Sequence, residues 1–104
     1  MITAEKFRNL ALSLAGATEQ PHFEKTSFRI NKKIFATLDS KKQSATLKLS
    51  ESDQDIFSLV DKTAIYPVPN KWGQQGWTVF ELDKLSEELV QDALTKAYVE
   101  VAKK

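Results

Sequence analysis

Two tryptophans, the only ones in the chain, enclose the short segment WGQQGW between positions 72 and 77. Indole rings can stack on nucleobases or pack into a core, and glutamine side chains both donate and accept hydrogen bonds. Gly73 and Gly76 allow close approach of the backbone and unusual dihedral angles, and Lys71 adds a cation beside them. The segment could therefore hold a nucleic acid, line a ligand pocket, or form a turn rich in aromatic residues.

The spacing G-x-x-G within this segment is also that of the loop with which KH domains clamp the nucleic-acid backbone. That loop joins two helices, whereas here YPVPNK precedes the segment and a strand pattern follows it, so the KH interpretation fails. We interpret the segment as a structured turn that leads into the last strand. It becomes part of a binding surface if Lys71, Gln74 and Gln75 face the basic part of the chain. For the tryptophans, packing into the core is the alternative.

Residues for familiar enzyme sites are missing from the sequence. His22 is the single histidine and there is no cysteine, so a histidine-based triad or a zinc site has no partners. Neither GxxxxGK[ST] nor GxGxxG occurs, which leaves phosphate binding by such loops unsupported. Glu51, Asp53 and Asp55 lie at the start of an expected helix, where negative charge suits the helix dipole better than a metal. We expect a protein that is not an enzyme and that uses no cofactor or metal.

Basic residues are concentrated in the first half of the chain. Between His22 and Lys48, seven basic and two acidic residues give a formal charge of +5, while the rest of the chain carries −4. Such an asymmetry can create a local positive field on a protein whose net charge is only +1. Lysines on turns and strand edges also discourage aggregation, so charge alone leaves both interpretations open.

The N-terminal segment does not have the pattern of a secretory signal, because Glu5, Lys6 and Arg8 interrupt its apolar residues. No stretch approaches the roughly 20 apolar residues that a membrane span requires. We therefore expect a cytoplasmic protein that does not enter a membrane.

Helical periodicity indicates three helices. Thr3 can cap a first helix that Gly16 ends, because serine and threonine accept from unpaired N–H groups and glycine closes a last turn. Ser50 begins a second helix and Ser86 a third, long one. The apolar stripe expected for the second helix consists of Ile56, Phe57 and Val60.

Alternating apolar and polar residues indicate four strands, at 27–30, 33–38, 44–49 and 77–82. A tight turn at Asn31-Lys32 joins the first two. In the second strand, the residues expected on the buried face are Ile34, Ala36 and Leu38, with Lys33, Phe35 and Thr37 on the other. Residues 1–104 are thus expected to form a single α+β domain, a two-layer sandwich with helices on one face of an antiparallel sheet.

Several segments carry a resemblance to a known family: PHF at 21–23, SFRI followed by KIFATL, LKLS at 47–50, and YPVPNKWGQQGWTVFEL at 66–82. Together they resemble the MmcQ/YjbR-like family of small bacterial proteins over essentially the full chain. WGQQGWT is the most specific block, and its longer loop is typical of one branch of the family. The resemblance implies a fold similar to secretion chaperones and to a frataxin-like sandwich. It also implies DNA binding through a double-winged surface.

Two functions are compatible with these observations. In the first, a basic and aromatic sheet face binds DNA without sequence readout, because cations neutralise phosphates and aromatic rings stack on bases. In the second, the same face binds a protein or peptide partner or forms a homodimer, as exposed apolar patches often do. The residues expected to contact nucleic acid are Arg29, Lys33, Phe35, Lys48, Lys71, Gln74, Gln75 and Trp77.

Overall fold

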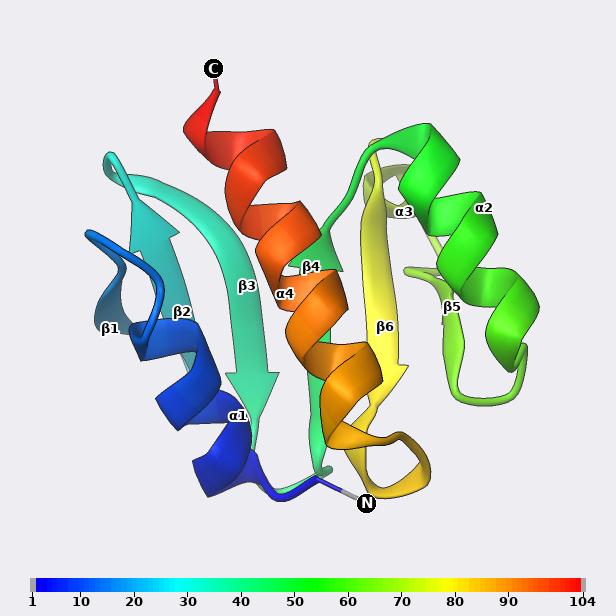
Figure 1. The fold of residues 1–104 in the computed structure, drawn as a ribbon, viewed down its shortest axis with the longest axis horizontal. Coiled ribbons are helices and arrows are strands. Elements are labelled where there is room, and N and C mark those ends of the chain that lie inside the picture. The colour runs from blue at the N-terminus through cyan, green and yellow to red at the C-terminus, as the bar shows by residue number, and fades with distance from the viewer. Residues whose placement is uncertain (1, 104) are drawn as a thin grey trace.

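The protein is a two-layer α+β sandwich in a computed structural model that describes residues 2–103, apart from the side chain of His22 (Figure 1). Over these residues the chain forms a six-stranded antiparallel sheet in the order β1-β2-β3-β4-β6-β5. The strands are β1 (Thr18–His22), β2 (Lys25–Ile30), β3 (Lys33–Asp39), β4 (Ser44–Lys48), β5 (Ile65–Pro67) and β6 (Trp77–Glu81). The helices are α1 (Ala4–Leu12), α2 (Glu51–Val60), α3 (Lys71–Gln74) and α4 (Glu87–Ala102), with a 3-10 turn, η1 (Leu82–Lys84). The fold class predicted from periodicity is confirmed.

Local signals in the sequence set most of the element boundaries. The side chains of Thr3, Ser50 and Ser86 each accept a hydrogen bond from a backbone N–H in the first turn of α1, α2 and α4, as predicted. Asn31 and Lys32 both have positive φ, 53° and 69°, so the predicted tight turn is of the type that matches strand twist. The first helix ends at Leu12, a turn earlier than the glycine signal indicated.

Two edge strands and one short helix were not predicted. β1 has the sequence TEQPH, in which a proline interrupts the run and no apolar alternation is present. β5 is only three residues long, IYP, and also contains a proline. Proline is tolerated at sheet edges because the outward N–H needs no ladder partner there. The predicted loop before the last strand therefore contributes β5 and α3 to the fold.

Phe35 lies in the core, so its predicted position on the opposite face of the sheet is wrong. The register between β2 and β3 shifts at a bulge: Phe28 is opposite Ala36, and Arg29 is opposite Ile34, which leaves Phe35 as the extra residue. Phe35 and Ala36 are both fully buried. The Phe35 ring packs edge-on against Tyr98 of α4 with centroids 5.7 Å apart. Because one extra residue restarts the alternation, Ile34 moves to the face that was predicted for Phe35.

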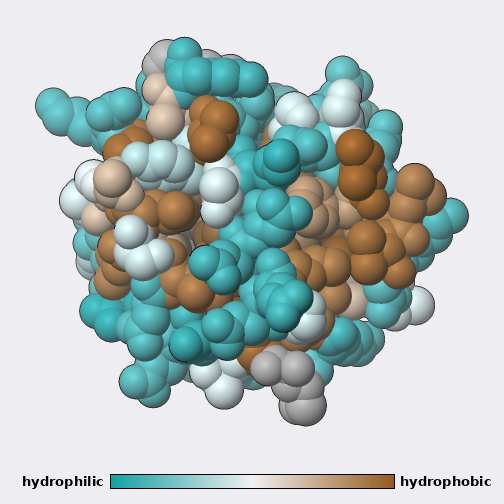
Figure 2. Space-filling model, in the orientation of Figure 1, coloured by the Kyte–Doolittle hydropathy of each residue, from teal (hydrophilic) through white to brown (hydrophobic). Residues whose placement is uncertain are grey.

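The second helix buries fewer apolar residues than its sequence suggests. Phe57 is buried and contacts Phe80 of β6 edge-on, but Ile56, Leu59 and Val60 are all more than half exposed. The prediction that Ile56 and Val60 complete the buried stripe is therefore wrong. Figure 2 shows these hydrophobic side chains gathered over α2. Within residues 2–103, no helix is long and apolar enough to cross a membrane.

Candidate functional site

In the described part of the chain, helices α1, α2 and α4 lie on one face of the sheet, and only α3 lies behind it (Figure 1). The face of the sheet opposite α1, α2 and α4 is called the uncovered face. In β4 and β6, every second side chain is partly exposed while its neighbours are buried, so one set of side chains points to this face. The side chains that the strands contribute to it include Lys25, Arg29, Ile34, Thr37, Ser44, Thr46, Lys48, Trp77, Val79 and Glu81.

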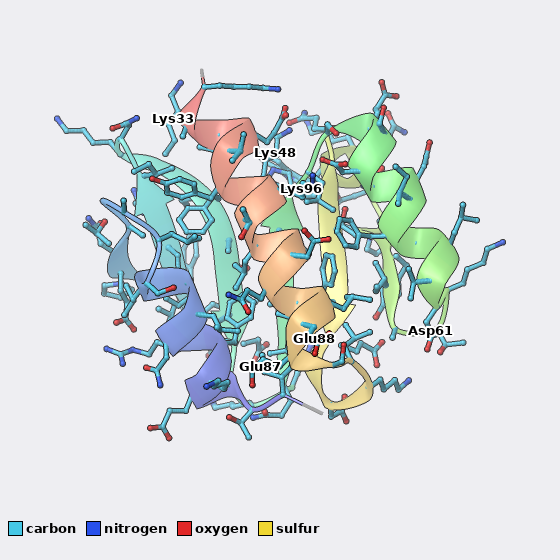
Figure 3. All side chains as sticks on the ribbon, in the orientation of Figure 1. Lys33, Lys48, Asp61, Glu87, Glu88 and Lys96 are labelled. Carbon is cyan, nitrogen blue, oxygen red and sulfur yellow. The ribbon has the colours of Figure 1, made fainter. Side chains whose placement is uncertain are left out.

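Several residues predicted to contact nucleic acid lie on or beside the uncovered face. Lys48 and Trp77 are opposite each other on β4 and β6. The Nζ atom of Lys48 donates to the backbone oxygen of Gln75, so strand β4 is tied to the loop. Arg29 lies on β2, where its Nε donates to Ser27 Oγ at 3.3 Å. Lys33 begins β3 at the same end of the sheet as Lys48 (Figure 3), but it pairs with the buried Ile30 and so lies on the helix-covered side of the bulge. Its predicted position on the uncovered face is therefore wrong.

The remaining predicted residues are divided between α3 and the core. Lys71 and Gln74 are exposed at the two ends of α3, and the exposed Gln75 follows it. Phe35 is buried beneath α4 and takes no part in this surface.

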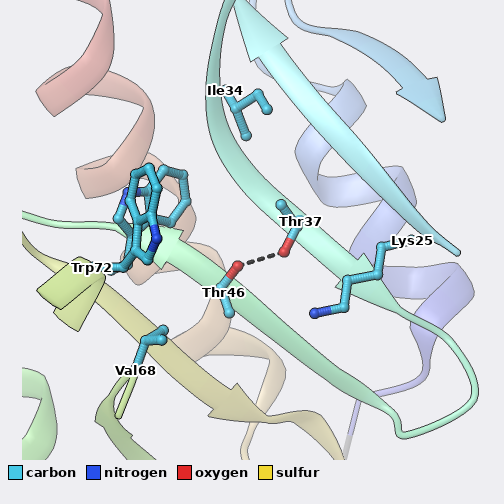
Figure 4. A pocket seen from close by; sticks show the side chains of 7 residues that line it. Lys25, Ile34, Thr37, Thr46, Val68 and Trp72 are labelled. Carbon is cyan, nitrogen blue, oxygen red and sulfur yellow. Dashed lines mark hydrogen bonds between the residues drawn. The ribbon is translucent and has the colours of Figure 1, made fainter. Parts of the chain in front are cut away.

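A groove on the uncovered face brings both tryptophans together with a lysine (Figure 4). It has a volume of about 460 Å³. Trp72, at the start of α3, is 51% exposed, whereas Trp77 on β6 is partly buried. The residues of this aromatic groove are Lys25, Ile34, Thr37, Thr46, Val68, Trp72 and Trp77.

The floor of the aromatic groove is polar at its centre. Thr37 and Thr46 are opposite each other on β3 and β4, and their hydroxyl groups are hydrogen-bonded. The Lys25 side chain comes from β2 and extends across β3 toward Thr46 (Figure 4). The groove thus combines two indole rings, two aliphatic side chains, a hydroxyl pair and a cation. None of Lys25, Ile34 and Trp72 was singled out as a contact residue from the sequence.

Neither glycine of WGQQGW can be replaced by a residue with a side chain without a collision with neighbouring backbone. A Cβ atom on Gly73 would lie 2.0 Å from the backbone oxygen of Val68, and one on Gly76 would lie 1.9 Å from that of Leu49. Gly76 also has a φ of 104°, which side chains rarely allow. Asn70 accepts a hydrogen bond from the Trp72 N–H at 2.8 Å and so starts α3. The loop that carries Trp72 is therefore fixed against the sheet.

A buried amide from α2 holds the same loop from the other side. Gln54 is 8% exposed, and its Nε2 donates to the Gly73 oxygen at 2.9 Å and to Thr78 Oγ1 at 3.0 Å. Thr78 Oγ1 in turn donates to the Gly76 oxygen at 3.0 Å. This Gln54 network joins α2, the loop and β6. A glutamine inside an amphipathic helix gives no sequence signal for such a role, because it is equally common on exposed positions.

Charge on the uncovered face is mixed. Lys25, Arg29 and Lys48 are on it, but a second hollow of about 510 Å³ adjoins the aromatic groove, and its charged residues are Asp39 and Glu81 as well as Lys25 and Lys42. The remaining cations of the basic segment lie at opposite ends of β3, with Lys32 and Lys33 at one end and Lys41 and Lys42 at the other. The cations of the basic segment are therefore divided between the uncovered face and the two ends of β3, and they do not gather at one site.

The Glu81 carboxylate is engaged by two neighbours. Tyr66 Oη donates to Oε2 at 2.6 Å, and Lys84 Nζ lies 3.2 Å from Oε1. The tyrosine hydrogen bond and, secondly, the lysine hold the pKa of Glu81 below its usual value, and the same hydrogen bond raises the pKa of Tyr66.

Replacing Tyr66 with phenylalanine should lower the free energy of unfolding by about 1 kcal/mol at pH 7. Because the pKa of Glu81 is depressed in the folded state, its stabilisation is present above the pKa of the unfolded chain, about 4.3, and disappears as the pH falls through the lower folded value. Urea unfolding of both proteins at several pH values should show the difference shrinking in acid. A difference that stays constant down to the lowest pH would assign the effect to packing instead of the carboxylate.

The chain forms a small α+β sandwich with a groove on the sheet face that α1, α2 and α4 leave uncovered. A family model described as YjbR matches residues 12–100, and the chain belongs to the YjbR family. The crystal structure of a Deinococcus radiodurans protein with a DUF419 domain is similar, with a TM-score of 0.85 and 23% sequence identity. That similarity covers 100% of this chain and 81% of the other, and it concerns the fold alone. No curated protein matches the chain.

Proposed function

We propose that the protein binds nucleic acid, DNA in the first instance, through the uncovered face and without chemistry or a cofactor. The observation that carries this proposal is the aromatic groove, where Trp72 and Trp77 line one hollow together with Lys25. Aromatic rings bind bases through their faces, and lysine and arginine neutralise phosphates, so such a surface binds without reading sequence. Arg29 and Lys48 lie on the same face as Lys25 and provide two further cations for phosphates. A cytoplasmic location fits this role.

The binding test is a titration of labelled single-stranded DNA followed by fluorescence anisotropy at several salt concentrations. If Lys25, Arg29 and Lys48 contact three phosphates, log K should fall with log salt at a slope of about −2, since each contact on a single strand releases about 0.7 counterions. Binding that is undetectable at low ionic strength would overturn the proposal.

Charge reversal localises the interaction. Lys25→Glu should weaken binding at low salt by about tenfold or more, because it replaces attraction with repulsion inside the groove. Lys96→Glu is the matched control: Lys96 is an exposed lysine on α4, in the helix layer (Figure 3). At the same salt concentration the control should weaken binding much less than Lys25→Glu does, and its small effect should disappear as added salt screens the net charge. Equal losses in both variants would mean that nucleic acid is attracted by net charge and not by the uncovered face.

A protein or peptide partner, or a second copy of the chain, is the alternative function. The exposed apolar residues of α2, Ile56, Leu59 and Val60, favour it, because exposed apolar patches often mark protein contacts. Size-exclusion mass measured over a range of concentrations distinguishes self-association from a stable monomer.

A further inference from the structure

We propose that the aromatic groove admits one unpaired nucleobase, so that the preferred ligand is a single strand and not a duplex. This inference rests on the proposed nucleic-acid function and names the form of nucleic acid that the groove can take. It depends on three features of the groove: where the indole rings are, what the floor offers, and where the cation lies.

The position of the indole rings favours an unpaired base. Trp72 stands on α3 and Trp77 on β6, and both line a hollow whose floor is the sheet itself. A base can stack on either indole ring only if one face of the base is not already covered by a neighbouring base. In a duplex both faces of each base are covered by neighbouring base pairs, whereas an unstacked base in a single strand can lie against an aromatic ring. The volume of about 460 Å³ is in the range of small-molecule pockets, roughly 300 to 1,000 Å³.

The floor of the groove can hydrogen-bond the edge of such a base. Thr37 and Thr46 share one hydrogen between their hydroxyl oxygens, so the other hydroxyl hydrogen and the remaining lone pairs can serve a ligand. Hydroxyl groups rotate, and the pair can therefore present a donor or an acceptor to different bases. A floor of this kind accommodates a base edge without demanding a particular base.

The ammonium group of Lys25 is placed to contact an oxygen atom of the bound nucleotide, either on its phosphate or on its base. Lys25 lines both the aromatic groove and the adjoining hollow, and its ammonium group is directed toward Thr46 (Figure 4). Lysine has only donors, so it suits a phosphate oxygen or a base carbonyl. The adjoining hollow carries both signs of charge, with Asp39 and Glu81 beside Lys25 and Lys42, so it attracts phosphates less than the side with Lys48 and Arg29. The strand is expected to leave the groove on the side of Lys48 and Arg29.

Intrinsic fluorescence tests this inference directly, because the chain has two tryptophans and both line the groove. The probes are a short oligothymidine, a strand of equal length made of abasic residues, and a duplex of the same length. We expect the oligothymidine to change the tryptophan emission and to bind about tenfold or more tightly than the abasic strand, since stacking of even one base is worth that factor. The duplex should bind as weakly as the abasic strand.

Variants of Trp72 separate stacking from folding. Trp72→Leu should remove the advantage of oligothymidine over the abasic strand, while Trp72→Phe, which keeps an aromatic face, should restore most of it. Trp72 is half-exposed, so neither change should alter the helical circular dichroism signal. Abasic and duplex probes that bind as tightly as oligothymidine would overturn the unpaired-base inference and leave nucleic-acid binding intact. Failure of all three probes to bind would overturn both.

Discussion

Replacing Gly76 with alanine should lower the free energy of unfolding by about 3 kcal/mol or more, because two costs combine at this position. The residue has a φ of 104°, and an added Cβ would meet the backbone oxygen of Leu49 at 1.9 Å. Leu49 directly follows β4, and its N–H donates to the Gly76 oxygen, so its backbone cannot move aside as a flexible side chain can. Urea unfolding followed by circular dichroism measures the loss. At temperatures where the variant stays folded, the proposed binding of nucleic acid should also weaken, because Gly76 positions Trp77.

Gly16→Ala is the matched control for this change. Gly16 also has a positive φ, 78°, but its added Cβ would meet only the end of the Ile30 side chain at 3.1 Å. The dihedral cost alone, about 1 kcal/mol, is expected there. If the two alanine variants lose equal stability, the contact with Leu49 is not what requires glycine at position 76.

Replacing Gln54 with leucine should lower the free energy of unfolding by about 2 kcal/mol. Leucine has a similar size but no donor, so the Gly73 oxygen and the Thr78 hydroxyl lose the amide that now bonds them. A buried acceptor without a partner costs more than the hydrogen bond itself contributed. Because the loop would be held less firmly, the tryptophan emission should shift toward that of solvent-exposed indole.

The control for Gln54→Leu is a substitution of an exposed glutamine in the loop that Gln54 holds. Gln74→Leu changes the same chemical groups at the end of α3, where the side chain is exposed, and should alter stability by no more than about 0.5 kcal/mol. A Gln54→Leu protein that is as stable as the Gln74→Leu protein would contradict the view that the Gln54 network holds the loop.

Features that depend on neighbouring residues were predictable from the sequence. The caps at Thr3, Ser50 and Ser86 need one hydroxyl and the next turn of helix, and the Asn31-Lys32 turn needs one residue that tolerates positive φ. The alternation in residues 77–82 is uninterrupted, and it assigned Trp77 to the uncovered face correctly. These local rules were sufficient for the order of the main helices and strands, and hence for the fold class.

Features that depend on residues distant in the chain were missed. The bulge that turns Phe35 into the core is set by pairing with β2, and the edge strands β1 and β5 exist because neighbouring strands supply their partners. Gln54 is buried because the WGQQGW loop closes over it, 19 residues later in the chain. The aromatic groove likewise combines residues of β2, β3, β4, α3 and β6, a set that no single segment could reveal.

The proposed nucleic-acid site is tested most directly by the amide and indole N–H signals of the ¹⁵N-labelled protein during titration with oligothymidine. Both indole signals should move, together with the amides of Thr37, Thr46 and Lys48 on the uncovered face, while the amides on the outer side of α4, such as that of Lys96, should stay in place. Signals that move along α4 or α2, with both indole signals unchanged, would contradict the proposed site.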